Sequence, residues 1–289
     1  MKWAASTAGE AGTKPEHLRK GGGLNEAGKR DPCGRSIWPI EEYGPSTYGD
    51  HIAEIYDEYV ASVQLDTEAT VAFLAEHAGS GPVLELAIGT GRIALPLAER
   101  GIDVRGIDAS EEMVTQLRSK PGGASIPVTF GDFAAVAVKG RYTLIYVVFN
   151  TLFALHTQEE QVHCFENVAA HLADDGAFVV EAFVPDLTRF DRDQRVQVDR
   201  VGLEDVWLHV DRHHPAEQRV DSQHIRLSEE GARFYPVQIR YAYPPELDLM
   251  ARLAGLRLRE RFDGWKREPY SGMTATCISV YERAGSGAP

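Results

Sequence analysis

Cysteine, long apolar runs and positive charge are all scarce in this chain of 289 residues. The three cysteines, Cys33, Cys164 and Cys277, lie far apart, no two have the spacing of a metal site, and their odd number does not suit a disulfide framework. We therefore expect a protein of the reducing cytoplasm. No apolar run approaches the roughly 20 residues of a membrane span. The first thirty residues hold no apolar segment, so we expect no signal peptide.

Basic residues are outnumbered by acidic ones, 30 to 43, which gives a net charge of −13. A surface of this sign repels nucleic acid unless it carries a local basic patch, and the sequence has no cluster of Lys and Arg in its folded region. We therefore expect a small-molecule partner, with no nucleic acid and no membrane. The length fits one domain with additions, as a monomer or a homodimer.

The two ends of the chain differ from its centre in composition. Residues 1–40 contain few large apolar residues and a run of three glycines, which predicts a flexible tail; an interaction arm is the functional alternative. Residues 284–289 are expected to form a second short tail. Within residues 41–80, the spacing of Ile52, Ile55, Tyr56 and Tyr59 is helical and predicts an N-terminal helical lid.

Strand and helix patterns alternate over residues 81–193, which predicts a doubly wound, mostly parallel, Rossmann-like sheet. Residues 194–243 then alternate apolar and polar positions without helices and predict an antiparallel β insert, a substrate cover or a dimer face. Residues 244–283 are expected to supply one helix and two closing strands. The expected strands of this seven-stranded core are 82–86, 104–107, 128–130, 143–148, 177–183, 256–262 and 276–281.

Three polar or glycine-rich features follow consecutive strands of this predicted core. Gly89 and Gly91 form a turn before a helix, where free N–H groups and the helix dipole favour a nucleotide-like ligand. Asp108 ends the next strand and can accept the ribose hydroxyls of an adenosine. Asp132, after the third strand, can accept from the adenine amino group, and Phe133 can pack against the ring. The same glycine loop also fits the nicotinamide pattern G-x-G-x-x-A, so NAD remains an alternative at this point.

Four stretches together resemble the motifs of class I S-adenosylmethionine-dependent methyltransferases, over roughly residues 48–185. They are VLELAIGTGR (83–92), GIDAS (106–110) with Met113, GDF (131–133), and YTLIY leading to FNT (142–151). The resemblance implies that Glu85 organises the loop near the methionine amino group and that Met113 flanks the adenine. Phe149 and Asn150 would contact the methionine portion, and Tyr48 and Tyr56 would be lid tyrosines. The expected cofactor-binding residues are Tyr48, Tyr56, Glu85, Ala87, Gly89, Gly91, Asp108, Ala109, Met113, Asp132, Phe133, Phe149 and Asn150.

Ala87 departs from the family pattern, which often has glycine there, and we expect it to be tolerated with a negative φ. For catalysis, His156 and Glu181 are candidate bases, although each also fits a purely structural role. His209 and His224 could approach each other on the insert, but no completing ligand is evident, so no metal is expected. Trp207, Phe234, Tyr241 and Tyr243 could line a substrate pocket or only a core or dimer face.

The sequence thus predicts an enzyme that methylates an N, O or nucleophilic C atom of a small molecule, in secondary metabolism. Two alternatives stand beside it. One is an NAD(P)-dependent oxidoreductase that uses the same loop, and the other is a non-catalytic protein that binds S-adenosylmethionine.

Overall fold

The computed structural model describes residues 43–285, except residue 64 and residues 136–137. The predicted tail over 1–40 therefore lies outside the described residues, as do residues 286–289 of the predicted C-terminal tail. The helices are α1 (Thr47–Ile52), α2 (Tyr56–Ser62), α3 (Thr67–His77), α4 (Ala94–Glu99), α5 (Glu111–Ser119), α6 (Gln158–His171) and α7 (Pro244–Leu253). The strands are β1 (Val83–Leu86), β2 (Val104–Asp108), β3 (Val128–Phe130), β4 (Tyr142–Val147), β5 (Leu172–Phe183), β6 (Gln194–Val201), β7 (Asp205–His214), β8 (Arg219–Ser228), β9 (Gly231–Arg240), β10 (Leu256–Phe262) and β11 (Thr276–Arg283).

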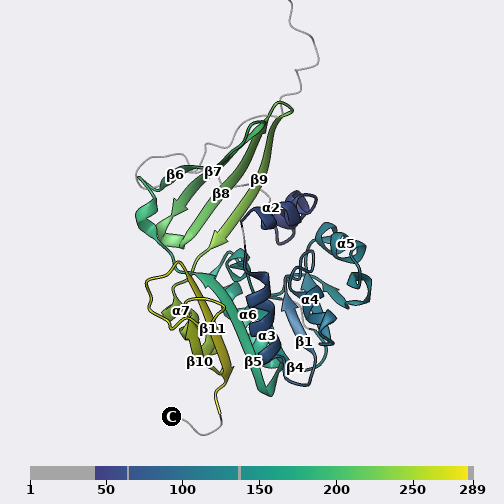
Figure 1. The fold of residues 1–289 in the computed structure, drawn as a ribbon. Helices are drawn as coiled ribbons and strands as arrows, with labels where there is room; N and C mark the ends of the chain where they lie inside the picture. The colour runs from purple at the N-terminus through teal and green to yellow at the C-terminus, as the bar shows by residue number, and fades with distance from the viewer. Residues whose placement is uncertain (1–42, 64, 136–137, 286–289) are drawn as a thin grey trace, which may run out of the picture. The chain divides into compact units, whose positions relative to one another are not determined.

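Seven strands form the central sheet in the order β10-β11-β5-β4-β1-β2-β3 (Figure 1). The pairs joining β3, β2, β1, β4 and β5 are parallel, and β10 and β11 close the sheet in antiparallel fashion. All four residues of β1 are buried, as expected of a strand covered by helices on both faces. The predicted Rossmann-like fold class is confirmed.

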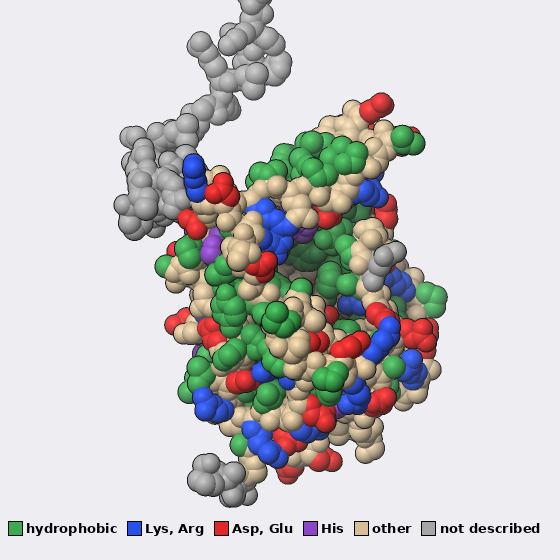
Figure 2. Space-filling view, turned by 60° about the vertical axis from the view of Figure 1, so that its left-hand side comes forward, with side chains coloured by type: hydrophobic (Ala, Val, Ile, Leu, Met, Phe, Trp, Pro, Cys, Tyr) green, Lys and Arg blue, Asp and Glu red, His purple; other side chains and the backbone are tan. Residues whose placement is uncertain are grey.

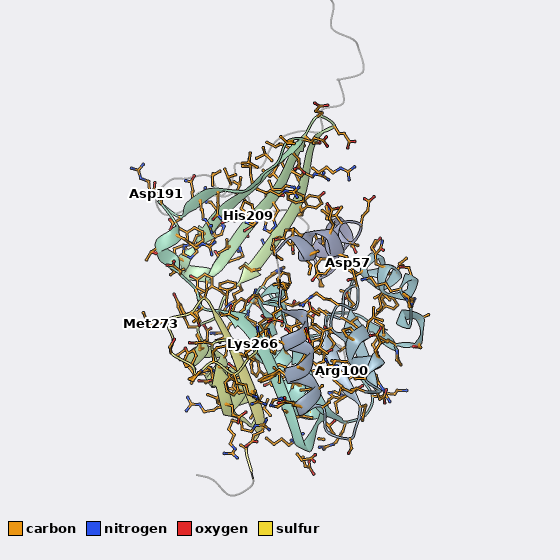
Figure 3. The ribbon with its side chains drawn as sticks, in the orientation of Figure 1. Asp57, Arg100, Asp191, His209, Lys266 and Met273 are labelled. Atoms are coloured by element: carbon orange, nitrogen blue, oxygen red, sulfur yellow. The ribbon has the colours of Figure 1, made fainter. Side chains whose placement is uncertain are left out.

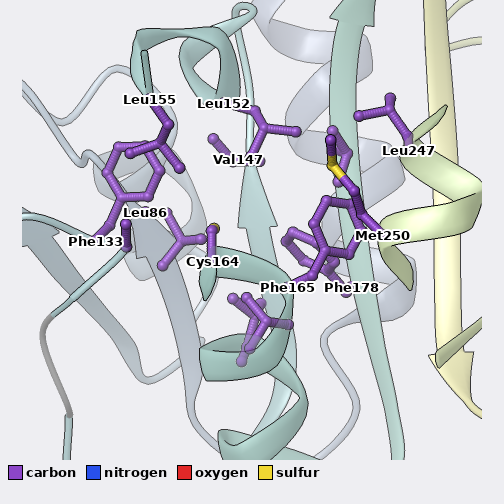
Figure 4. Packing of buried hydrophobic residues seen from close by; sticks show 14 of the residues in the cluster. Leu86, Phe133, Val147, Leu152, Leu155, Cys164, Phe165, Phe178, Leu247 and Met250 are labelled. Atoms are coloured by element: carbon purple, nitrogen blue, oxygen red, sulfur yellow. The ribbon is translucent and has the colours of Figure 1, made fainter. Parts of the chain in front are cut away.

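Helices cover both faces of this sheet. On one face, α6 and α7 pack against the strands in a cluster that includes Leu86, Phe165, Phe178 and Met250 (Figure 4). The other face is covered by α3 and α4. Helix α3, capped by Asp66, which accepts from the Ala69 N–H at 3.0 Å, is therefore a layer of the core. Of the segment 41–80, only α1 and α2 lie outside this layer, and we call them the lid helices after the role predicted for that segment.

The insert is a four-stranded antiparallel sheet in the order β6-β7-β8-β9. Its two faces differ because successive side chains of a strand point to opposite sides. One face carries Trp207 and Tyr235, both buried, in a cluster with the lid residue Ile52 and with Met113 of α5. The opposite face carries apolar side chains that are exposed, among them Val196, Val198 and Phe234. The face of the insert that packs against α1 and α2 is therefore the one that can form part of a site.

Candidate active site

The glycine loop leaves β1 with three residues in the left-handed region: Ala87 at φ 56°, Gly89 at φ 56° and Gly91 at φ 81°. The expectation of a negative φ at Ala87 is wrong. The chain turns sharply after β1, and alanine, with the smallest side chain after glycine, bears the strain of that turn. A methyl group built at Gly91 would lie 2.4 Å from Leu117 Cδ1, whereas at Gly89 it would meet no described atom within 4 Å. The backbone at Gly89 is thus open to a ligand.

Asp108 joins the end of β2 to this loop. Its Oδ2 accepts from the Gly89 N–H at 2.7 Å, and its Oδ1 accepts from the Ser110 N–H at 2.9 Å, across the half-buried Ala109. Burial raises the pKa of the Asp108 carboxyl, although these backbone donors oppose the rise. Helix α5 itself is capped by Ser110, which accepts from the Met113 N–H. Asp108 therefore holds the glycine loop against the end of β2 and is not the N-cap residue of α5.

Glu85 lies buried on β1 beneath the loop, and the Tyr146 hydroxyl donates to its Oε2 at 2.9 Å. Burial raises the pKa of Glu85 to about 8, while Tyr146 and Arg92 oppose the rise. Sequence reasoning assigned no role to Arg92. Its guanidinium lies 5.6 Å from the centroid of the Phe149 ring and donates to Thr67 Oγ1 of α3 at 3.2 Å. In the sequence, only its position directly after Gly91 could have indicated a role for this arginine.

The turn after β4 places Phe149 at φ 57° and Asn150 at φ 63°. Two consecutive non-glycine residues in this region store strain, which is typical of functional sites. Glu181, on β5, holds the turn: its Oε2 accepts from the Phe149 N–H at 2.5 Å, and its Oε1 accepts from Trp265 Nε1 at 3.2 Å. Burial raises the pKa of Glu181. Because both oxygens are engaged, the geometry favours the loop-organising role.

The lid helix α2 is fastened directly to the glycine loop. Thr90 Oγ1 donates to Asp57 Oδ1 at 2.6 Å, and Lys120 Nζ lies 2.5 Å from Asp57 Oδ2 while donating to the Thr90 carbonyl at 2.9 Å. The lid tyrosines Tyr48 and Tyr56 pack in the cluster that holds Met113. We refer to Asp57, Thr90 and Lys120 as the lid latch.

The third expected motif is only partly available to a ligand. Asp132 Oδ1 accepts from the Ala134 N–H at 2.8 Å in a half-buried turn. Phe133, however, is buried to 8% exposure in the core beside Leu155 (Figure 4). The predicted contact of this ring with the adenine stays a prediction, since the ring packs mainly in the core beside α6.

His156 lies away from the strand ends. Its Nε2 is 3.1 Å from the Gln238 carbonyl of β9, and its ring meets Tyr43 edge-on at 5.1 Å. Burial lowers the pKa of this imidazole, so it is neutral at pH 7. The structure thus places His156 at the junction of the core and the insert.

Figure 2 shows the surface hollowed beneath the antiparallel sheet, with hydrophobic side chains gathered there. A pocket lies between the insert and the lid helix α2. Trp207 lines it, whereas Phe234 is exposed on the opposite face and Tyr241 is buried in the core. Among the described residues, no group of three or more His, Cys, Asp or Glu could hold a metal. The pocket lining is Ile55, Glu58, Tyr59, Ser62, Asp199, Arg200, Trp207 and Arg226.

Known proteins share this architecture. Residues 83–176 match the family model described as a methyltransferase domain. The solved CcbJ methyltransferase from Streptomyces caelestis is 37% identical, with a TM-score of 0.80 over 84% of this chain and 100% of its own. Cypemycin N-terminal methyltransferase from a Streptomyces species is 27% identical over 83% of this chain and 98% of its own. CalS10 from Micromonospora echinaspora, an amino pentose methyltransferase solved with S-adenosylmethionine, shares the fold at 20% identity (TM-score 0.61; 79% of this chain, 96% of its own).

The chain belongs to the class I S-adenosylmethionine-dependent methyltransferases. It is therefore an enzyme, and S-adenosylmethionine is its cofactor. None of these three relatives is a nicotinamide-dependent oxidoreductase. Across residues 43–285, gaps aside, no helix has the length and apolar character to cross a membrane.

Proposed function

We propose that this enzyme transfers the methyl group to an amine nitrogen of a small molecule of secondary metabolism. The proposal rests on one observation, which is that helix α2 has two contacts. Its Asp57 accepts a hydrogen bond from Thr90 of the glycine loop, and its Tyr59 lines the pocket under the insert. Residues two apart on a helix do not face each other, so α2 lies between the pocket and the glycine loop and connects the two. The choice of nitrogen is supported by two relatives, one named for a peptide N-terminus and one for an amino pentose.

The residues around the loop fit S-adenosylmethionine. The open backbone at Gly89 suits a close approach, and the buried Glu85 and Asp108 offer carboxyl groups on the two sides of the loop. We assign Asp108 to the ribose and Asp132 to the adenine edge. Glu85, Phe149 and Asn150 are assigned to the methionine portion, and Met113 and the lid tyrosines to the cover.

Bound S-adenosylmethionine supplies an electrophilic methyl group on a positively charged sulfur. The chain's own task is to align the acceptor for in-line attack and to exclude water. The lid latch closes one side of the site. Glu181 and Trp265 fix the Phe149 turn that faces the same strand ends. A neutral amine needs no general base to attack, so we assign positioning roles to Glu181 and His156.

Mass spectrometry with methyl-labelled S-adenosylmethionine tests the proposal. The panel holds the tripeptide Ala-Thr-Pro, D-glucosamine, L-prolinamide and p-cresol. We expect label on at least one amine and none on the phenol. Label on p-cresol alone would overturn the choice of nitrogen. If no acceptor is labelled, calorimetric titrations with S-adenosylhomocysteine and, in parallel, with NAD check that the protein is folded and able to bind its cofactor.

A further inference from the structure

Three polar side chains form a row across the face of the insert that looks toward the lid. His209 on β7 pairs with His224 on β8, and His224 pairs with Tyr235 on β9, so the three side chains share one face. The two imidazole rings are stacked, with centroids 3.8 Å apart and planes 15° apart. We call this set the His-His-Tyr row, and Figure 3 labels His209 within it.

Each member of the row has a polar atom that is buried and lacks a hydrogen-bond partner among the described residues. The atoms are His209 Nε2, His224 Nδ1 and Tyr235 Oη. The carboxylate nearest to His209, Asp199 Oδ2, lies 3.8 Å from Nε2, beyond hydrogen-bond distance. Such atoms are rare in folded proteins because each one left unpaired is destabilising. Three such atoms on neighbouring strands indicate that a bound molecule supplies the missing hydrogen bonds.

The row lies next to the lid helix α2. Tyr59 of α2 lies 6.1 Å from the His224 ring and 6.2 Å from the Trp207 ring, centroid to centroid. Trp207 also stacks on Tyr235, at 5.7 Å and 10°. One hydrophobic cluster joins Trp207 and Tyr235 to Met113, which we assign to the adenine. A molecule against the row is therefore under the lid.

The row does not suit a metal ion, because stacked parallel rings cannot direct their nitrogen lone pairs at one point between them. Nor does it suit a base: burial and the His209 ring lower the pKa of His224 to about 3. The ring of His224 is thus uncharged at neutral pH. The His224 ring can therefore form a hydrogen bond without repelling a sulfonium or a protonated amine.

We propose that the His-His-Tyr row binds the methyl acceptor through hydrogen bonds and so selects a polar aliphatic amine that carries further hydroxyl or amide groups. This rests on the proposed function, since it takes the acceptor to be a small amine. The aromatic ring of Tyr59 contacts the apolar side of such a molecule.

Tyr235→Phe gives the sharpest test, because it deletes one unpartnered oxygen and nothing else. We expect a melting temperature equal to or above that of the wild type. We expect the KM for the amine of the panel that is methylated to rise at least fivefold, with the Kd for S-adenosylhomocysteine unchanged. His224→Phe, which keeps the ring and removes its nitrogens, should act in the same direction. Tyr241→Phe is the matched control: its hydroxyl bonds to His213 Nε2 at 2.9 Å in the core, so its loss should lower the melting temperature and leave KM alone.

A binding measurement separates this proposal from the proposed function. The imidazole nitrogen signals of His209 and His224 are recorded by NMR with S-adenosylhomocysteine bound, while each of the four panel molecules is added. Shifts of both histidines that Tyr235→Phe weakens support the row even if no methyl group is transferred. The proposal is overturned if no panel molecule shifts these signals, or if Tyr235→Phe lowers the melting temperature with KM unchanged.

Discussion

The Thr90 hydroxyl donates a 2.6 Å hydrogen bond to the Asp57 carboxylate, and this contact joins the lid helix α2 to the glycine loop. Lys120 lies against the same carboxylate. Asp57→Asn removes the charge and should weaken binding of S-adenosylhomocysteine about fivefold, since a half-exposed pair contributes up to about 1 kcal/mol. Stopped-flow dissociation should show the change in the off-rate. Glu58→Gln, on the same helix but outside the latch, should leave that rate unaltered; equal effects of the two would mean that only net charge matters.

Asp108 accepts hydrogen bonds from the glycine loop, and we propose that it also binds the ribose; the two roles can be measured separately. Asp108→Ala should weaken the binding of S-adenosylmethionine by about 1–3 kcal/mol, because a charged hydrogen-bonding group is lost. It should also lower the stability of the free enzyme, since the N–H groups of Gly89 and Ser110 lose their acceptor. Calorimetry gives the first quantity and thermal unfolding without ligand gives the second. If the loss of binding free energy were no larger than the loss of unfolding free energy, Asp108 would only hold the loop in place and would not bind the ribose.

Ala87 adopts a φ of 56°, which costs an L-residue about 1–2 kcal/mol relative to glycine. Ala87→Gly should therefore stabilise the enzyme by about 1 kcal/mol, or raise its melting temperature by roughly 2–4 °C. Ala98→Gly in α4 is the control and should destabilise by a similar amount, because glycine is unfavourable within a helix. If Ala87→Gly lowered the melting temperature instead, the methyl group of Ala87 would be making packing contacts that outweigh its strain.

Glu85 makes stability depend on pH. Its pKa in the folded enzyme, about 8, lies above the ordinary value of 4.5, so the folded state binds the extra proton. Stability from this group is fully present below pH 4.5 and is lost as pH rises toward 8. Glu85→Gln should flatten the decline in unfolding free energy between these limits, measured by urea titration. The same decline in the variant would assign the pH dependence to other groups.

Glu181 distinguishes positioning from base catalysis. Glu181→Gln leaves one oxygen that can accept from either the Phe149 N–H or Trp265 Nε1, whereas the Glu181 carboxyl group accepts from both. We expect kcat to fall about tenfold, which corresponds to roughly 1.4 kcal/mol, with the shape of the pH profile retained. Loss of the acidic limb of that profile would identify Glu181 as the base. His156→Asn should change the melting temperature more than kcat, because its ring bonds to Gln238 at the junction with the insert.

The sequence predicted the sheet because buried parallel strands leave a strong signal: β1, β2 and β4 are short apolar runs, each followed by a turn and a helix. The insert was also predictable, since β7 and β8 alternate polar and apolar residues. The start of β5 at Leu172, rather than at 177, was not, because the polar residues Asp174 and Asp175 are typical of a loop.

Within the site, the strand-end positions could be predicted and the contacts between them could not. Trp265 meets Glu181 across 84 residues of sequence, and Arg92 meets the Phe149 ring only once β1 and β4 are paired. Phe133 shows the converse: its place in a motif indicated a ligand contact, while packing under α6 decided where its ring lies. The φ of Ala87 follows from a turn that alanine does not by itself favour.

Trp207 and Trp265 lie in different surroundings: Trp207 stacks on Tyr235 of the insert, and Trp265 donates to Glu181 near the end of β5. The chain has two more tryptophans, Trp3 and Trp38. Replacing those two by phenylalanine would leave an enzyme with two native fluorophores. Occupancy of the acceptor side and of the methyl-donor side could then be followed optically and in real time, without an attached dye.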